Sequence, residues 1–333
     1  MVRIGVIGAG GIANAIHLPA LKEIGACTVA AVCDLREDRA KGAAEKFDIP
    51  AYYALQHIMI EKERLDGVVV LVDPDRLYRA AYECLDAGLP VLMEKPAGLS
   101  SYQARSLAQK SKKANKLLAV AMNRRHVPVV QYALKRMKEL TAINQVDGVF
   151  IKNSGIDETW HYASAFVCDI VHAVDLVRYL AGSEPVKAAT IISANDSPVD
   201  NAWSSVMKFE NGVTGTLKSN YRTGGRVHTF EMHGPGASAF INLGFGDTSC
   251  DAKIIHSKGG MYSMSSGGVG KQETEYIDGV KLAGGDKYYQ YYGYKQEDAE
   301  FVDCINTGGQ PLCGIEDAAK TMEAVELLLK SAI

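Results

Sequence analysis

The feature that most constrains the fold is a glycine-rich turn near the start of the chain, Gly8-Ala9-Gly10-Gly11-Ile12-Ala13. It fits the pattern G-x-G-x-x-G/A, follows an apolar run at Arg3–Ile7 that predicts a strand, and opens a segment at Ile12–Ile24 that predicts a helix. In this context the first glycine makes the tight turn, the second lets a pyrophosphate approach the backbone, and the small Ala13 lets helix and strand pack closely. The free N–H groups of the helix N-terminus favour phosphate. The motif therefore predicts dinucleotide binding.

An acidic residue stands where such a motif needs one. Asp34 directly follows a second apolar run, Thr28–Cys33, and lies about 20 residues beyond the glycines. A carboxylate there accepts hydrogen bonds from ribose hydroxyls and repels a 2′-phosphate, so Asp34 favours NAD. Arg36 and Arg39 follow closely and keep NADP open as the alternative. With strand, turn, helix and acid together, a ligand-free glycine turn is the weaker interpretation.

The first third of the chain alternates strand and helix signals. Strands are expected at Arg3–Ile7, Thr28–Cys33, Gly67–Val72, Pro90–Met93 and Leu117–Met122. Helices are expected between them at Ile12–Ile24, Arg36–Phe47, Arg76–Ala87 and Ser101–Asn115. This alternation predicts an α/β fold with an N-terminal Rossmann domain, a doubly wound parallel sheet.

After Asn123 the pattern changes to strands that follow one another through turns. Asn211-Gly212 lies between two strand-like runs, which is a strong hairpin signal. Helices are expected at Pro128–Leu140 and Ala165–Leu180 and in two closing segments, Gln290–Asn306 and Ile315–Ser331. We therefore expect residues 1–124 to form the Rossmann domain. Residues 125–333 are expected to form an α+β domain with a mostly antiparallel open sheet that binds substrate and forms oligomers.

Composition excludes several classes of protein. The chain has 333 residues, 47% of them hydrophobic, and a net charge of -3, so it carries no basic footprint for nucleic acid or an anionic membrane. No apolar run is long enough to span a bilayer, and no signal peptide is recognisable. The seven cysteines form no C-x-x-C pair, which argues against a disulfide framework or a zinc site. We expect a cytoplasmic protein.

A lysine stands at the end of one predicted strand, in the sequence Met93-Glu94-Lys95-Pro96. In open α/β sheets ligands bind outside the carboxyl ends of the strands, so Lys95 is expected beside the cofactor. A lysine there can hydrogen-bond a substrate oxygen and stabilise the negative charge that grows on it. Taken alone, a charged residue leaving a strand would be the simpler interpretation.

These motifs, together with Asn123-Arg124-Arg125, resemble the Gfo/Idh/MocA family, the glucose–fructose oxidoreductases, inositol dehydrogenases and their relatives. The resemblance implies an NAD(P)-dependent oxidoreductase acting on a small polyhydroxylated substrate, with no metal. It also implies a set of cofactor contacts beyond the glycine turn, Asp34 and Arg36, namely Val72, Pro74, Tyr78, Glu94, Lys95 and Asn123. One departure is Tyr78, because relatives often carry T-P-N-x-x-H where this chain has Asp73-Pro74-Asp75-Arg76-Leu77-Tyr78.

The segment Phe166–Gly182 resembles the family's substrate helix, which carries D-x-x-x-H-x-x-D. His172 and Asp175 match in register, but the position four before His172 is Cys168, and Asp169 stands one residue off. On an α-helix Asp169 and His172 would still share a face. The resemblance implies that His172 is the general base, that Asp169 orients it, and that Lys95 holds the reacting oxygen.

Weaker candidates complete the predicted site. Arg124, Trp160 and His161 are expected to contact substrate, although Trp160 and His161 could equally be loop packing residues. A zinc site at Cys168, His172 and His161 lacks ligand spacing. An uncovered sheet face in the second domain predicts a homodimer or homotetramer.

Two other functions remain open. A catalytically silent sensor that binds dinucleotide would fit the loss of Asp at position 168 and of His at position 78. A reductase for another carbonyl or imine class is the third possibility, with no specific residue in its favour.

Overall fold

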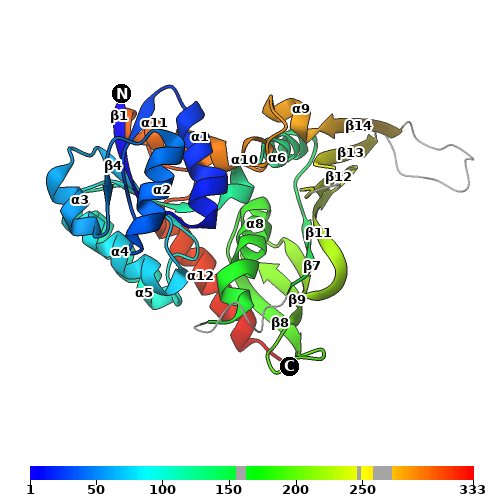
Figure 1. The fold of residues 1–333 in the computed structure, drawn as a ribbon. Coiled ribbons are helices and arrows are strands. Elements are labelled where there is room, and N and C mark those ends of the chain that lie inside the picture. Colours follow the sequence, from blue (N-terminus) through cyan, green and yellow to red (C-terminus); the bar gives the residue numbers. More distant parts are fainter. Residues whose placement is uncertain (155–162, 246–248, 258–271) are drawn as a thin grey trace, which may run out of the picture. The chain divides into compact units, whose positions relative to one another are not determined.

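The computed structural model describes residues 1–154, 163–245, 249–257 and 272–333 (Figure 1). The chain forms two compact units. The first comprises Met1–His126, Val167–Val171 and Lys287–Glu323, and the second comprises Val127–Phe166, His172–Asp286 and Ala324–Ile333. Among the described residues, no helix is both long and apolar enough to cross a membrane.

The first unit contains a six-stranded parallel sheet in the order β3-β2-β1-β4-β5-β6. Its strands are β1 (Val2–Ile7), β2 (Cys27–Cys33), β3 (Tyr52–Tyr53), β4 (Gly67–Val70), β5 (Val91–Glu94) and β6 (Leu118–Ala121). This order is that of the dinucleotide-binding Rossmann fold, so the predicted doubly wound sheet is confirmed. Every residue of β4 and β5 is buried, which agrees with their apolar sequences.

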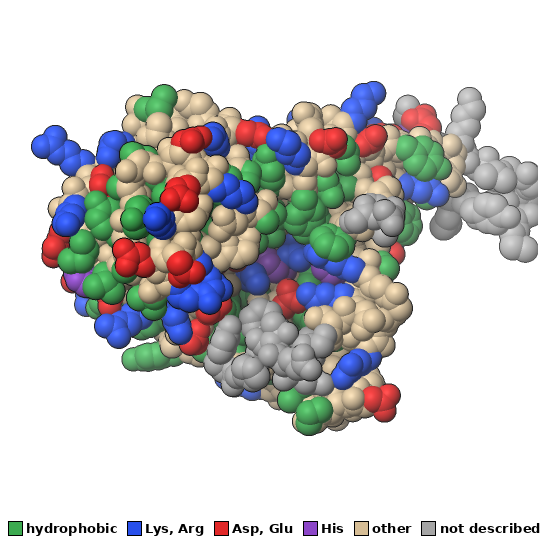
Figure 2. All heavy atoms as spheres, in the orientation of Figure 1, with side chains coloured by type: hydrophobic (Ala, Val, Ile, Leu, Met, Phe, Trp, Pro, Cys, Tyr) green, Lys and Arg blue, Asp and Glu red, His purple; other side chains and the backbone are tan. Residues whose placement is uncertain are grey.

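Helices cover this sheet and connect its strands. They are η1 (Ala13–His17), α1 (Leu18–Glu23), α2 (Glu37–Phe47), α3 (Gln56–Lys62), α4 (Pro74–Asp86), α5 (Ser101–Ala114) and η2 (Asn123–His126). The segment expected as one helix from Ile12 begins as a π-helical stretch, η1, before the α-helical turns of α1. On the face of this unit seen in Figure 2, acidic and basic side chains are interspersed.

The closing part of the chain returns to the first unit as α10 (Tyr288–Tyr291), α11 (Tyr294–Thr307) and the start of α12 (Ile315–Lys330). Phe301 and Val302 of α11 belong to the apolar core built on β1 and β4. A Cβ on Gly67 of β4 would lie 2.6 Å from Ile305 Cδ1, so glycine lets α11 approach the sheet. A compact unit in the structure does not show that residues 1–124 fold by themselves, so the domain boundary expected at residue 124 stays a prediction.

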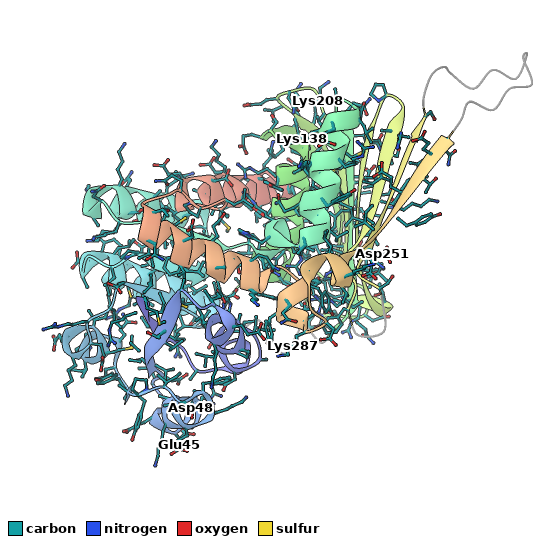
Figure 3. All side chains as sticks on the ribbon, turned by 90° about the horizontal axis from the view of Figure 1, so that it is seen from above. Glu45, Asp48, Lys138, Lys208, Asp251 and Lys287 are labelled. Atoms are coloured by element: carbon teal, nitrogen blue, oxygen red, sulfur yellow. The ribbon has the colours of Figure 1, made fainter. Side chains whose placement is uncertain are left out.

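Glu23, at the end of α1, anchors this returning segment. Its carboxylate accepts hydrogen bonds from the side chains of Lys287, Tyr289, Gln290 and Lys295. Those bonds, led by the one from Lys295, hold the pKa of Glu23 well below its usual value. Figure 3 labels Lys287 where the returning segment begins.

The second unit contains an eight-stranded sheet in the order β14-β13-β12-β11-β7-β10-β9-β8. Its strands are β7 (Gln145–Asn153), β8 (Pro185–Ser193), β9 (Ala202–Phe209), β10 (Thr214–Asn220), β11 (Arg222–Gly234), β12 (Ala237–Asn242), β13 (Asp251–Ser257) and β14 (Gln272–Asp278). Among the described strands of this sheet, only β7 and β10 pair in parallel, so the mostly antiparallel sheet is confirmed. The β9–β10 hairpin turns at Asn211-Gly212, with Gly212 at φ 89°.

One face of this sheet packs against helices. They are α6 (Pro128–Leu140), which contacts β12 and β13, α8 (Val171–Ala181) and α9 (Gly279–Ala283). Figure 3 shows α6, which carries Lys138, lying along these strands. The absence of a side chain at Gly148 of β7 lets α8 lie close to the sheet, because a Cβ there would lie 3.0 Å from Val177 Cγ2 on α8. The predicted helix Ala165–Leu180 begins as a π-helical stretch, η3 (Phe166–Ile170), before α8.

Candidate functional site

The glycine turn has the geometry that its sequence predicts. Gly8 has φ 101°, and a Cβ there would clash with the main-chain oxygen of Leu71, so only glycine fits. A Cβ on Gly10 or Gly11 would meet no atom within 4 Å. Ala13 is fully buried in the core between helix and sheet. The turn therefore leaves open space beside the backbone, as a bound pyrophosphate requires.

Asp34 connects this turn to the end of β2. Its Oδ2 accepts the main-chain N–H of Ala9 at 2.9 Å, and its Oδ1 accepts the main-chain N–H of Arg36 at 2.9 Å. Each carboxylate oxygen can accept a further bond. The side chain is half-buried and therefore remains within reach of a ligand.

A cavity of about 700 Å³ extends from the glycine turn along the carboxyl edge of the sheet. Five of the residues predicted to bind the cofactor line it: Gly8, Gly10, Asp34, Arg36 and Val72. Sequence reasoning missed others in its wall, including Leu55, His57, Arg76 and Arg79. Leu55 comes from the β3–α3 connection, His57 from α3, and Arg76 and Arg79 from α4, and no motif marks them. The volume lies in the usual range for sites that hold small ligands.

The remaining predicted cofactor residues do not line this cavity: Gly11, Ile12, Ala13, Pro74, Tyr78, Glu94, Lys95 and Asn123. The Tyr78 hydroxyl lies 2.9 Å from Ser106 Oγ of α5. The fully buried Asn123 donates from Nδ2 to the carbonyl of Tyr292 at 2.8 Å, which ties the end of β6 to the returning segment. Cofactor contacts by these residues stay predictions.

Lys95 follows β5 directly and is joined to Pro96 by a cis peptide bond. Its main-chain N–H donates to Oε2 of the buried Glu94 at 3.1 Å. Its Nζ donates to the main-chain oxygen of Cys168 at 2.9 Å. The main chain of Lys95 and the end of its side chain are therefore both hydrogen-bonded. They lie at the carboxyl edge of the sheet, where ligands of this fold bind.

The segment that carries the predicted base is less regular than its sequence suggested. Asp169 lies in the π-helical η3 and His172 in α8, so α-helical spacing no longer describes how the two side chains are related. Burial raises the pKa of the Cys168 thiol to about 11, so this side chain is neutral and cannot replace a carboxylate. Asp169 is half-buried and His172 is buried. Their catalytic roles stay predictions.

Of the expected substrate residues, Arg124 is buried, with its guanidinium carbon 5.7 Å from the centre of the Tyr292 ring. Trp160 and His161 lie outside the described residues.

Within the second unit, aromatic and basic side chains gather on the face of the sheet that α8 covers. The rings of Phe150 and His228 stack with centroids 3.8 Å apart. Lys152 Nζ lies 5.1 Å from the centre of the Tyr221 ring, and Tyr221 in turn packs edge-on against Trp203. These residues are spread over three strands and the end of a fourth, so no local pattern in the sequence reveals them.

The strand order, the glycine turn, the aspartate at the end of β2 and the cavity together define a dinucleotide-binding α/β protein with a second, mostly antiparallel unit. A family model described as an oxidoreductase family with an NAD-binding Rossmann fold matches residues 2–122. The GFO/IDH/MocA C-terminal domain matches residues 134–240. The chain therefore belongs to the GFO/IDH/MocA family of NAD-binding oxidoreductases.

Curated relatives and solved structures agree with this assignment. The chain is 27% identical over 238 residues to myo-inositol 2-dehydrogenase of Thermotoga maritima, covering 66% of this chain and 69% of that protein. It is 25% identical over 343 residues to D-xylose 1-dehydrogenase (NADP(+)) 2 of Haloferax volcanii, covering 98% of this chain and 96% of that protein. A levoglucosan dehydrogenase solved with NADH and levoglucosan has the same fold, with a TM-score of 0.85 and 18% identity over 99% of this chain and 96% of that one.

Proposed function

We propose that the protein transfers a hydride between a nicotinamide cofactor and a hydroxyl or carbonyl carbon of a sugar, glycoside or cyclitol. The observation that carries the proposal is Lys95, whose ammonium group is fixed at the carboxyl edge of the Rossmann sheet by the main-chain oxygen of Cys168. The names of the relatives, which include inositol and xylose dehydrogenases, support the substrate class. The chain belongs to their family and aligns with the xylose enzyme over nearly its whole length.

When bound, the nicotinamide accepts or donates the hydride. The groups of this chain then provide position and proton transfer. His172 takes the proton of the substrate hydroxyl, and in the reverse direction it returns it. Lys95 donates a hydrogen bond to the reacting oxygen and stabilises the charge that develops on it. Asp169 is the carboxylate proposed to orient His172, since the neutral thiol of Cys168 cannot do so.

NAD is the preferred cofactor in this proposal, since Asp34 stands where it can accept bonds from ribose hydroxyls. Arginines line the same cavity, however: Arg36, Arg39, Arg76 and Arg79. They give a 2′-phosphate positive partners, so NADP is the cofactor to compare.

The test is turnover by the purified protein with NAD⁺ or NADP⁺ and a panel of polyols that includes myo-inositol, D-xylose and levoglucosan, followed by the absorbance of the reduced cofactor. On the best substrate, Lys95→Met and His172→Asn are expected to lower kcat by about 10²–10⁴-fold. Lys113→Met, which removes a charge from the exposed side of α5, is the matched control and should leave kcat unchanged. Near-normal kcat in Lys95→Met or His172→Asn would refute the corresponding role. Tight NAD binding without turnover on any substrate would instead favour a sensor.

We also propose that the sheet of the second unit pairs with another copy of this chain. The face away from α6 and α8 carries exposed apolar side chains, among them Ile191, Val206 and Tyr276, which are 56%, 56% and 78% exposed. Ile191 and Val206 lie in the neighbouring strands β8 and β9, and exposed apolar side chains that share one sheet face are typical of an interface. Light scattering should give a multiple of the chain's 35.9 kDa, and Val206→Glu should shift it toward the monomer. A monomeric mass for the unmodified protein at working concentration would refute the proposal.

A further inference from the structure

A buried group of ionisable side chains lies behind Lys95, inside the first unit. His17 is fully buried at the end of η1. Its Nδ1 lies 2.9 Å from Oδ1 of Asp298 in α11, and its Nε2 lies 3.4 Å from Oε1 of Glu94 in β5. Asp298 and Glu94 are also buried. The imidazole therefore bridges two carboxylates that are far apart in the sequence.

Both ring nitrogens face carboxyl oxygens, and each nitrogen donates a hydrogen bond when the ring is doubly protonated and both carboxyl groups are ionised. Burial raises the pKa of Asp298, and the charge of His17 and its hydrogen bond oppose that shift. Burial alone disfavours the charged ring. The charges and hydrogen bonds of Asp298 and Glu94 outweigh it and raise the pKa of His17 well above its usual 6.5. Two further groups of α11 face this centre. Burial raises the pKa of Glu297 well above its usual value, and it likewise raises the pKa of Tyr294, whose ring packs edge-on against His17, so burial favours the neutral form of each.

A metal ion does not account for this cluster. His17, Asp298 and Glu297 offer ligand atoms close enough to hold one ion. A metal ligand, however, needs a free nitrogen lone pair, and the doubly protonated ring that the raised pKa of His17 favours offers none. An imidazolium between two carboxylates fits the observed contacts without any ion.

The bridge ends at the lysine. Glu94 presents Oε1 to His17 and Oε2 to the main-chain N–H of Lys95. Asp298, His17, Glu94 and Lys95 thus alternate in charge from α11 to the edge of the sheet. In a medium of low polarity such alternation is favourable, and removing one member leaves a buried charge without its partner.

We propose that His17 is a positioning residue for Lys95: its doubly protonated ring, anchored on Asp298, holds Glu94 so that the Glu94 carboxylate fixes the main chain of the lysine. This inference rests on the proposed function only because that proposal makes Lys95 the group that contacts the reacting oxygen. Catalytic groups misplaced by about 1 Å can lose on the order of 10²-fold in rate, so a residue that positions Lys95 without contacting substrate still affects kcat.

Two variants separate positioning from mere structural support. His17→Gln removes the imidazole that bridges Asp298 and Glu94, so its kcat should be at least about tenfold lower than that of the unmodified protein. The ratio of the two kcat values should be the same at every pH. Asp298→Asn keeps the ring but removes the negative charge that favours its protonated form. The ratio of its kcat to that of the unmodified protein should be near one at pH 6. This ratio should fall by about tenfold toward pH 9, because the ring loses its second proton.

Glu297→Gln is the matched control, because Glu297 is in the same helix, is also buried, and has a raised pKa that favours its neutral form. Its relative kcat should stay near one at all pH values. A purely structural role would lower melting temperatures without giving Asp298→Asn a pH-dependent ratio. A flat ratio in Asp298→Asn, or unchanged kcat in His17→Gln, would overturn the inference. If His17→Gln does not fold, Asp298→Asn decides the question alone.

A second readout needs no turnover and therefore separates this inference from the proposed function. The rate at which acetic anhydride labels Lys95, measured by peptide mass spectrometry, should rise several-fold in Asp298→Asn at pH 9, because the ammonium group leaves the Cys168 oxygen. It should be unchanged in Glu297→Gln. Equal labelling of Lys95 in all three proteins would refute positioning by His17, even if the protein proves to turn over no polyol.

Discussion

The carboxylate of Asp34 accepts the main-chain N–H of Ala9 at 2.9 Å, so the end of β2 and the glycine turn are joined by a hydrogen bond to a charged group. Such bonds contribute more than those between neutral groups. Asp34 therefore shapes the turn before any ribose hydroxyl reaches it.

Replacing this carboxylate should affect cofactor choice and stability together. In Asp34→Ala, we expect KM for NAD to rise by about tenfold or more, and the free energy of unfolding to fall by about 1–3 kcal/mol, because the Ala9 and Arg36 N–H groups lose their acceptor. The ratio of kcat/KM for NADP to that for NAD should rise, since a 2′-phosphate no longer meets a negative charge. Asp38→Asn, on the exposed side of α2, is the control. An unchanged cofactor ratio in Asp34→Ala would contradict the assigned role.

Two glycines of the turn should respond differently to the same substitution. Gly8→Ala places a methyl group against the Leu71 carbonyl at a positive φ, so it should lower the melting temperature and the free energy of unfolding by at least about 1–3 kcal/mol. Gly10→Ala meets no atom, so stability should be unchanged while KM for NAD rises, since the methyl group occupies the space left for phosphate. Equal loss of stability in both variants would show that this account of the turn is wrong.

The cysteines should be unreactive in the folded protein. All seven are buried and none is in a disulfide bond, and burial raises the pKa of Cys33, Cys84 and Cys250 to about 12. The thiolate is the reactive form, so Ellman's reagent at pH 8 should label the folded protein slowly. Full labelling should appear in guanidinium chloride. Rapid labelling of the folded protein would indicate that these thiols open to solvent.

His126 should make stability depend on pH in the acid range. Burial and the neighbouring charge of Arg125 lower its pKa to about 4 in the folded protein, whereas an unfolded histidine titrates near 6.5. Below pH 6.5 the unfolded chain takes up a proton that the folded chain does not. This residue therefore lowers stability by up to about 1.4 kcal/mol per pH unit as the pH falls from 6.5 to 4.

The check is urea unfolding of the unmodified protein and of His126→Gln between pH 4 and pH 8. The variant should show the smaller loss of stability toward acid, and the two curves should run parallel above pH 7. A parallel course below pH 6 would mean that His126 is protonated in the folded protein as readily as in the unfolded one.

The Rossmann sheet could be predicted because long apolar runs and a glycine turn carry it. The short β3 and the helix α3 could not be predicted, since Tyr52 is exposed to 39% and Gln56–Lys62 buries only Met59. Similarly, the sequence of Phe166–Ile170 does not indicate that its turns are π-helical, because hydrophobic spacing does not distinguish a wide turn from a normal one over five residues.

The site was predictable only where one short segment holds all of its parts. The glycine turn and Asp34 lie within a single strand–helix–strand unit, and five of the predicted residues do line the cavity. Arg76, Arg79 and His57 join it through tertiary packing. The contact between His17 and Asp298 joins residues 281 positions apart, and no local pattern signals such a pair.

The return of Lys287–Glu323 to the first unit has a consequence for biosynthesis. The ribosome synthesises the strands of the six-stranded sheet first, whereas Phe301 and Val302, which complete its core, follow only after strands β7 to β14. Nascent chains fold as their segments emerge, so the surface that α11 later covers stays open while the intervening residues are translated. Chaperone capture of stalled chains should therefore persist until translation has passed α11.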